Sequence, residues 1–322
     1  MDRSLLIFGN GLGMSLDSNY FSLQNALDKV WGDSVYLSST HKALIQSAIE
    51  GTTEKTPPKS EEQLDDLQLA IIAIEFLSEF EKDDISWVSD GAKELPSAFK
   101  KYVHSVAHYF HQSDHKLDDT FVSPLSDFIK KTMSHVATLN YDNLLYDSLQ
   151  STDVLTGYDG PLIDGFWARK GGFDPTHLDR NNVNEHGWYL HLHGSPLYVG
   201  NKKLVRHEKS FLNPTENCHI VLTHVQHKPS IIGFSHILSE YWLRLKRANQ
   251  ESKKIIFFGY SGKDGHLNET LNLQDKDIIV IESKRSGGES IREEFWKYTL
   301  DQDNINLIQL ENILDFSDWD SL

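Results

Sequence analysis

Short apolar runs that stop at glycine or at a polar residue recur along the chain. The run from Leu5 to Phe8 stops at Gly9, as a buried parallel strand does where it ends in a turn. Runs of the same kind predict further strands at residues 135–139, 188–192, 219–222, 255–258, 278–281 and 305–310. The segment 158–185 is rich in glycine, aspartate and asparagine, and we expect it to be mostly loop.

Apolar residues at helical spacing separate the predicted strands. They recur on one helical face from Leu64 to Leu77 and again from Phe99 to Phe110, after a polar loop with two prolines at 51–61. We therefore expect a helical insertion over residues 61–130, within a single domain that spans residues 1–322. Strands that alternate with helices predict an α/β fold, Rossmann-like, with a mostly parallel sheet flanked by helices.

Polar motifs directly follow four of the apolar runs. They are Gly9-Asn10-Gly11-Leu12-Gly13, Asn140-Tyr141-Asp142, His193-Gly194-Ser195 and Gly259-Tyr260-Ser261-Gly262. In open parallel sheets, ligands bind beyond the carboxyl ends of the strands. The four motifs therefore predict one crevice lined by glycines, amides, a carboxylate and an imidazole.

The first motif suits a phosphate cradle, because small residues let backbone N–H groups approach a pyrophosphate. Met14 stands where the dinucleotide fingerprint has its last glycine, so the motif is not that fingerprint. A glycine-rich turn that only packs tightly is an equally good interpretation. Gly9, Asn10 and Gly11 are thus candidate cofactor-binding residues.

Asn140 and Asp142 end a predicted strand and are candidate catalytic residues. The Asn140 amide could hold a ribose hydroxyl or position a water, and Asp142 could accept from a ligand carboxamide or ribose. The alternative is that one of them caps the helix expected to start near Asn143, a position that favours asparagine and aspartate.

His193 stands before Gly194 at a strand end and is the candidate general base. An unperturbed imidazole titrates near pH ~6.5, so it can accept a proton at neutral pH. His191 points to the same strand face, which makes a metal site conceivable, but the spacing supplies no further ligands. We predict that His191 is a buried, hydrogen-bonded strand histidine and that the chain binds no metal.

Two further strand ends carry candidate cofactor contacts. Gly259, Tyr260 and Ser261 form a turn that could approach a pyrophosphate or a ribose, and the alternative is a plain strand-end turn. Glu282 closes another predicted strand and could accept from a ribose hydroxyl. A solvated carboxylate at a strand end is an equally good interpretation of Glu282.

Composition narrows the class of protein. The 322 residues are 39% hydrophobic and 11% aromatic, which supports a substantial core, and the formal charge of −16 argues against direct nucleic-acid binding. The single cysteine excludes an internal disulfide framework and a multi-cysteine zinc site. No secretory signal or membrane-spanning run of ~20 apolar residues is evident, so we expect a soluble, cytoplasmic protein with no membrane contact.

Together these motifs resemble the sirtuin domain, in its prokaryotic sirtuin-like branch. The Gly9–Gly13 segment stands where sirtuins carry their phosphate loop, and Thr138-Leu139-Asn140-Tyr141-Asp142 resembles a Thr-x-Asn-x-Asp motif that binds NAD near the scissile bond. Leu192-His193-Gly194 is similar to the catalytic His-Gly, and Phe258-Gly259-Tyr260-Ser261 is similar to the later cofactor loop. The resemblance therefore adds Thr138 and Gly194 to the candidate cofactor-binding residues.

The sequence departs from sirtuin deacylases in two places. Deacylases carry a four-cysteine zinc module between the catalytic histidine and the later cofactor loop, whereas this chain has only Cys218. Met14-Ser15-Leu16-Asp17 stands where Gly-Ile-Pro-Asp-Phe-Arg is expected, so that only Asp17 matches as a further cofactor-binding candidate.

The resemblance implies an enzyme, an NAD glycohydrolase (NADase) that uses NAD as substrate, cleaves its nicotinamide–ribose bond and releases nicotinamide and ADP-ribose. Bacterial sirtuin-like proteins without the zinc module often act in antiphage defence by abortive infection. By analogy, the chain would be a silent effector that acts as a homo-oligomer or with a sensor partner: a HerA-like ATPase, a short Argonaute or a purine-pyrophosphatase-like protein. A non-catalytic NAD or ADP-ribose sensor stays open as an alternative, as does a deacylase or ADP-ribosyltransferase, which the cysteine count disfavours.

Overall fold

The computed structural model contains a seven-stranded, wholly parallel sheet with the order β10-β9-β8-β1-β2-β4-β3. The strands are β1 (Ser4–Phe8), β2 (His135–Thr138), β3 (Leu162–Ile163), β4 (Gly187–His191), β8 (Lys254–Phe258), β9 (Asp277–Ser283) and β10 (Ile305–Leu310). The structure describes residues 3–49, 52–53, 55–58, 63–64, 67, 70–71, 73–74, 90–112, 114–156, 160–166, 172–180, 185–204, 218–222 and 228–322.

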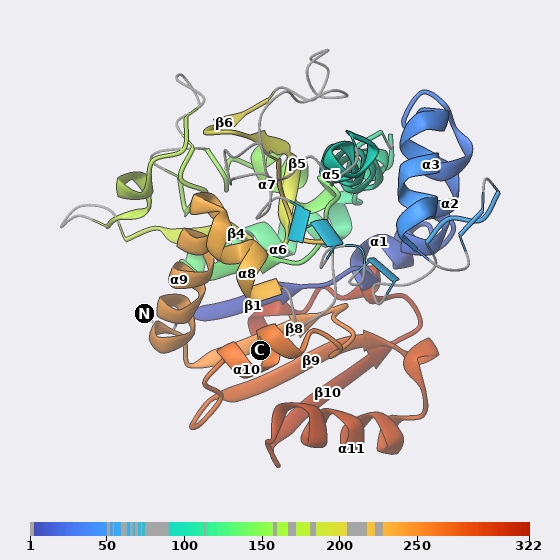
Figure 1. Cartoon of the computed structure of the whole chain (residues 1–322). Helices are drawn as coiled ribbons and strands as arrows, with labels where there is room; N and C mark the ends of the chain where they lie inside the picture. The colour runs from blue at the N-terminus through green and yellow to red at the C-terminus, as the bar shows by residue number, and fades with distance from the viewer. Residues whose placement is uncertain are drawn as a thin grey trace.

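The order of the strands reverses beside β1. The chain first builds β2, β3 and β4 on one side of β1 and then crosses over to add β8, β9 and β10 on the other (Figure 1). Open α/β sheets bind ligands where the strand order reverses, which here is the edge shared by β1 and β8. The predicted α/β, Rossmann-like sheet is confirmed.

Helices cover both faces of the sheet. The side chains of β1 alternate between the two faces, and each face forms its own hydrophobic core with the helices that cover it. Leu6 and Phe8 belong to one core, and Leu5 and Ile7 belong to the other. The first core holds α2 (Leu23–Gly32), α3 (Ser39–Ala48), α5 (Asp90–Phe110), α6 (Asp119–Thr132) and α7 (Leu144–Ser151). The second core holds α9 (His236–Glu251), α10 (Gly265–Thr270) and α11 (Glu289–Leu300).

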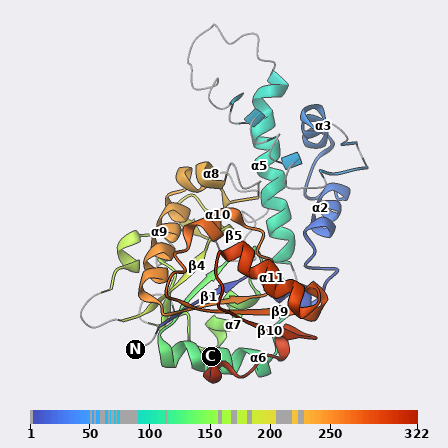
Figure 2. The same ribbon diagram turned by 90° about the horizontal axis from the view of Figure 1, so that it is seen from below.

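The helical part between β1 and β2 begins earlier than the sequence suggested. Figure 2 shows α5 extending away from the sheet with α2 and α3, which precede residue 61, beside it. The described residues between 63 and 74 are helical, as predicted, whereas Leu77 lies outside the described residues. The insertion over 61–130 stays a prediction. Among the described helices, none is long and apolar enough to cross a membrane.

A second, antiparallel sheet follows β4 in the chain. It has the order β6-β5-β7 and consists of β5 (Gly194–Val199), β6 (Lys202–Lys203) and β7 (Cys218–Ile220). The apolar run at 219–222 therefore forms a strand of this small sheet. The sequence pattern missed β5 and the two-residue β3, because both are too short or too irregular to show a clear period.

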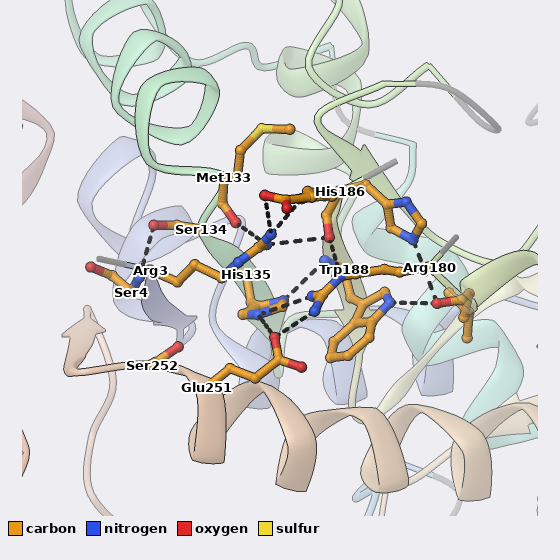
Figure 3. Close-up of polar contacts among 12 residues, drawn as sticks. Arg3, Ser4, Met133, Ser134, His135, Arg180, His186, Trp188, Glu251 and Ser252 are labelled. Carbon is orange, nitrogen blue, oxygen red and sulfur yellow. Dashed lines mark hydrogen bonds and ion pairs between the residues drawn. The ribbon is translucent and has the colours of Figure 1, made fainter. Parts of the chain in front are cut away.

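An ionic cluster closes the amino-terminal edge of the parallel sheet. Trp188 packs against both the Arg180 guanidinium, which lies 4.2 Å from its ring centroid, and the His135 ring, whose centroid is 4.7 Å away (Figure 3). Arg180 Nη1 lies 2.6 Å from Glu251 Oε2, and His135 Nε2 lies 3.3 Å from the same oxygen. The cluster ties α9 to the starts of β2 and β4 and leaves the carboxyl edge for the polar motifs.

Candidate functional site

Four polar motifs meet at the carboxyl edge of the sheet. Each motif lies just beyond the end of a strand: Gly9 follows β1, Asn140 follows β2, Gly259 follows β8 and His193 follows β4. In the sheet, β8, β1, β2 and β4 are successive neighbours. Because all these strands are parallel, their carboxyl ends lie at one edge. The chain therefore brings the four motifs together around the point where the strand order reverses.

The two glycine turns pack backbone against backbone. Gly9 N–H donates to Phe258 O at 3.0 Å and Gly11 N–H donates to Gly259 O at 2.8 Å. A Cβ on Gly9 would stand 2.6 Å from Tyr260 Cα, and one on Gly11 would stand 2.6 Å from Gly259 O. Tight packing alone therefore requires both glycines, and their contact with phosphate stays a prediction.

The residues after the first glycine turn hold a local loop together. Asn10 Nδ2 donates to Phe21 O at 3.0 Å. Asp17 ends α1 (Gly11–Leu16), and its Oδ1 accepts the N–H groups of Asn19 and Tyr20 at 2.9 and 3.0 Å. Hydrogen bonds from these backbone groups, that of Tyr20 foremost, lower the pKa of Asp17. Both candidate cofactor contacts thus serve the loop, and a contact with NAD is left as a prediction.

Asn140 is buried between the ends of β1 and β2, and its side-chain amide is only partly hydrogen-bonded. Its N–H donates to Thr138 Oγ1 at 3.1 Å, and its Nδ2 donates to Gly9 O at 3.1 Å. The second of these bonds orients the side-chain amide. In the described part of the chain, the buried Asn140 Oδ1 has no hydrogen-bond partner. Buried acceptors are nearly always satisfied, so this atom is suited to receive a hydroxyl or water from a bound ligand.

Asp142 caps the helix that follows. Its Oδ1 accepts the N–H of Leu144, the first residue of α7, at 3.0 Å, while Asn143 donates to Asp147 on the same helix. The capping alternative therefore holds for Asp142. Burial raises the pKa of Asp142 to about 6, so near neutral pH its carboxyl group is close to its titration range. Its contact with a ligand carboxamide stays a prediction.

His193 is held by a carboxylate that the sequence analysis missed. The imidazole is 8% exposed, and its Nε2 lies 2.8 Å from Asp264 Oδ2. Lys228 Nζ, from the start of α8 (Lys228–Phe234), lies 2.7 Å from the same oxygen. Burial by itself would raise the pKa of Asp264, but the hydrogen bond from His193 and the charge of Lys228 outweigh it and hold the pKa well below its usual range.

A sequence signal for Asp264 existed. The residue lies three positions after Ser261, and its Oδ1 accepts the N–H of Leu267 at 3.0 Å, which makes it the cap of α10. An aspartate just before a helix is a recognisable cap. Sequence alone, however, gives no reason for the second carboxylate oxygen to reach His193.

The two histidines of the His-Leu-His segment have different surroundings. His191 is 3% exposed among the rings of Tyr146, Tyr189 and Tyr198, and burial lowers its pKa to about 3. The predicted burial of this strand histidine is therefore confirmed, whereas its Nδ1 has no hydrogen-bond partner among the described residues. Among the described residues, no group of three or more histidine, cysteine, aspartate or glutamate side chains could hold a metal ion.

Gly194 fixes the backbone next to His193. Its φ is +80°, and a Cβ there would stand 1.7 Å from His219 O. Only glycine meets both conditions, because a left-handed backbone and a contact this close exclude a side chain. The glycine thereby holds the start of β5 against β7 and sets the direction in which His193 leaves β4.

The later turn has one buried and one open side chain. Gly259 has a φ of +60° and donates to Ile281 O at 2.9 Å. Tyr260 is 4% exposed, and its hydroxyl accepts the Asp264 N–H at 3.0 Å. Ser261 is exposed, with its Oγ 3.3 Å from the N–H of Lys263. Tyr260 therefore shapes the loop that carries Asp264, and Ser261 offers the side chain that a ligand could reach.

Glu282 is neither solvated nor open. It is 2% exposed, and its carboxylate accepts from Arg292, Trp296 and Gln309 at distances between 2.7 and 3.1 Å. The interpretation as a solvated carboxylate is wrong, because α11 and β10 enclose the end of β9. These three donors favour a structural role over ribose binding.

Comparison with known proteins agrees with this arrangement. Residues 134–281 match the family model of the SIR2-like domain, a range that begins one residue before β2, ends within β9 and includes Asn140, His193, Lys228 and Asp264. A search of curated proteins finds no match to the chain. SIR2-like domains bind or process NAD, and many are NAD-utilising enzymes. The chain therefore carries a SIR2-like domain over residues 134–281, and this match supports a sirtuin-like family.

Proposed function

We propose that the protein is an NAD glycohydrolase that breaks the nicotinamide–ribose bond of NAD. One observation carries the proposal. At the carboxyl edge of the sheet lie a buried amide, that of Asn140, whose oxygen has no partner among the described residues, and an imidazole, that of His193, which a carboxylate holds. The SIR2-like domain match supports NAD as the ligand. The Asn140 oxygen without a partner supports a hydroxyl-bearing ligand, such as a ribose or the attacking water.

Departure of the leaving group needs no general acid. Nicotinamide leaves as a neutral molecule, because its ring nitrogen already carries the positive charge in NAD, and the ribose passes through an oxocarbenium-like transition state, as in glycoside cleavage. Asn140 would orient the ribose or the water, and His193 would take the proton of the water as it attacks. Asp142 would hold the nicotinamide side, and Gly9, Gly11 and Ser261 would seat the phosphates.

The single cysteine favours water over a protein substrate. A deacylase captures the same ribose cation with an acyl-lysine oxygen and needs a peptide groove, which sirtuins build against their zinc module. With Cys218 as its only cysteine, the chain lacks the ligands for such a module. In place of a four-cysteine segment, residues after His193 form the antiparallel sheet of β5, β6 and β7.

The test is release of nicotinamide and ADP-ribose from NAD, followed by chromatography. We expect His193→Ala to lower the rate by about 10²- to 10⁴-fold, the usual contribution of a general base, and Asn140→Ala to lower it as well. His236→Ala and Asn306→Ala, both at exposed positions, are the matched controls and should keep the wild-type rate. Intact NAD recovered both from the protein alone and from its mixture with the product of the neighbouring gene, with binding still detectable, would overturn hydrolysis in favour of a sensor.

We also propose that the protein is an effector of antiphage defence. Its activity would be silent until a partner protein binds or an oligomer forms. This rests on the resemblance to sirtuin-like defence proteins and on the toxicity of unregulated NAD loss. The candidate partners are a HerA-like ATPase, a short Argonaute and a purine-pyrophosphatase-like protein. The protein should be assayed alone and mixed with the product of its neighbouring gene, and equal NAD consumption in both mixtures would contradict this regulation.

A further inference from the structure

Three side chains from distant parts of the chain form a buried charged chain at the site. Asp264 Oδ2 lies 2.8 Å from His193 Nε2 and 2.7 Å from Lys228 Nζ. The exposed fractions are 8% for His193, 4% for Lys228 and 6% for Asp264. Burying charged groups costs free energy unless each is paired. A protein with apolar side chains of similar volume at these positions is often equally stable. The arrangement therefore calls for a role other than stability.

We propose that Asp264 and Lys228 are positioning residues that fix the reactive nitrogen of His193 and set the pH range in which it acts as a base. The proposal rests on the proposed function of His193 in NAD hydrolysis. Neither residue needs to touch NAD for this role, because both act through the imidazole.

The bond to Asp264 decides which nitrogen of His193 is the base. An ionised carboxylate only accepts hydrogen bonds, so Nε2 of His193 must carry the proton that it donates to Asp264. In the neutral ring, the lone pair is then on Nδ1, and this nitrogen takes the proton of the water. Without Asp264, the proton would be free to occupy either nitrogen, and only part of the molecules would hold the productive tautomer.

The two partners have opposite electrostatic effects on His193. The Asp264 carboxylate stabilises the imidazolium, whereas the Lys228 ammonium, bonded to the same oxygen, opposes it. Other groups facing the triad are His266, whose burial lowers its pKa, and Tyr260, whose hydroxyl bonds the Asp264 backbone. The ring of Tyr141 lies 6.2 Å from that of His193. None of these carries a fixed charge, so Asp264 and Lys228 dominate the local field.

The test compares pH profiles of kcat/KM for nicotinamide release in Asp264→Asn and Lys228→Met. Removing the carboxylate should move the acidic limb to lower pH, and removing the ammonium should move it to higher pH, each by about one unit. KM should change less than kcat, and Asp264→Asn should lower kcat by about tenfold or more through loss of the tautomer. Asp277→Asn and Lys297→Met, at exposed positions, are the matched controls.

A general loss of structure at the site would shift both pH profiles in the same direction or leave both unchanged. Shifts of opposite sign are therefore specific to the two charges. Unmoved limbs in both variants would overturn the proposal, and so would shifts of the same sign. Lys228→Arg, which keeps the charge, should restore the wild-type profile.

A second measurement stands apart from hydrolysis. The ¹⁵N shifts of the His193 imidazole, assigned by comparison with His193→Gln, should show the proton on Nε2 in the wild type and a mixture of tautomers in Asp264→Asn. If the wild type hydrolyses no NAD, either alone or mixed with the product of its neighbouring gene, the proposed function fails, while this spectrum still tests the positioning of His193. Identical tautomer populations in both proteins would refute the positioning by Asp264.

Discussion

Replacing His135 with asparagine removes a buried titratable ring while keeping an acceptor for its main contact. His135 Nδ1 accepts the N–H of Trp188 at 3.2 Å, and an asparagine Oδ1 can occupy nearly the same position. The His135 side chain is completely buried, and Nε2 faces Glu251 (Figure 3). Protonating Nδ1 would break the bond to Trp188, so the folded protein resists this charge.

The magnitude follows from the pKa. Burial, opposed by the hydrogen bond to Glu251 and aided by the charge of Arg180, lowers the pKa of His135 from 6.5 to about 4. The unfolded chain therefore binds this proton at a higher pH than the folded one. The contribution of His135 to stability is complete above about pH 6.5 and is lost as the pH falls towards 4. At 1.36 kcal/mol per pH unit, the full loss is about 3 kcal/mol, of which about 2 kcal/mol appears by pH 5.

The assay is urea unfolding of the wild type and His135→Asn at pH 7.5, 6 and 5, followed by tryptophan fluorescence and circular dichroism. The free energy of unfolding of the wild type should fall by about 2 kcal/mol more than that of the variant over this range. His236→Asn, at an exposed position, controls for loss of an imidazole. Parallel curves for the wild type and His135→Asn would refute the reasoning, because His135 would then titrate alike in both states.

Three further substitutions test the rest of the structure. Gly194→Ala should cost about 3 kcal/mol or more in urea unfolding, because its Cβ would clash with His219 O and its φ is +80°. Lys203→Met should destabilise by about 3 kcal/mol at pH 8, since it leaves the buried Asp164 without the Lys203 Nζ group 2.7 Å away. Burial raises the pKa of Asp164 to about 7 and lowers that of Lys203 to about 7. Protonation of Asp164 relieves the loss at low pH, so unfolding at pH 6 should show a smaller effect than at pH 8. Glu282→Gln should lower the free energy of unfolding by about 3 kcal/mol, because it removes the charge that pairs with Arg292, while the Kd for NAD in calorimetry should change little. Weakened NAD binding with unchanged stability would instead assign Glu282 to the ribose.

Local patterns predicted much of the molecule. The apolar runs marked β1, β2, β4, β8, β9 and β10, and glycine or polar residues marked where most of them end. In the first five strands, burial on both faces leaves a continuous apolar signature, whereas the edge strand β10 is only partly buried. The spacing from Phe99 to Phe110 likewise marked the buried face of α5. Strand ends are local features, and the parallel sheet then brings them to one edge.

The tertiary structure decided how the polar groups are partnered. Asp264 bonds His193 across 71 residues and Lys228 across 36, and those pairings depend on which helices cover the sheet. Glu282 illustrates the same limit, because α11 and β10 convert an apparently solvated strand end into a buried ionic contact. The sequence by itself determined most strands of the parallel sheet and the edge at which the motifs meet, since periodicity is set by near neighbours. Only the packed chain decided which motif residues keep an atom without a partner in the described parts of the chain, as Asn140 Oδ1 does, since hydrogen-bond partners come from segments far apart in sequence.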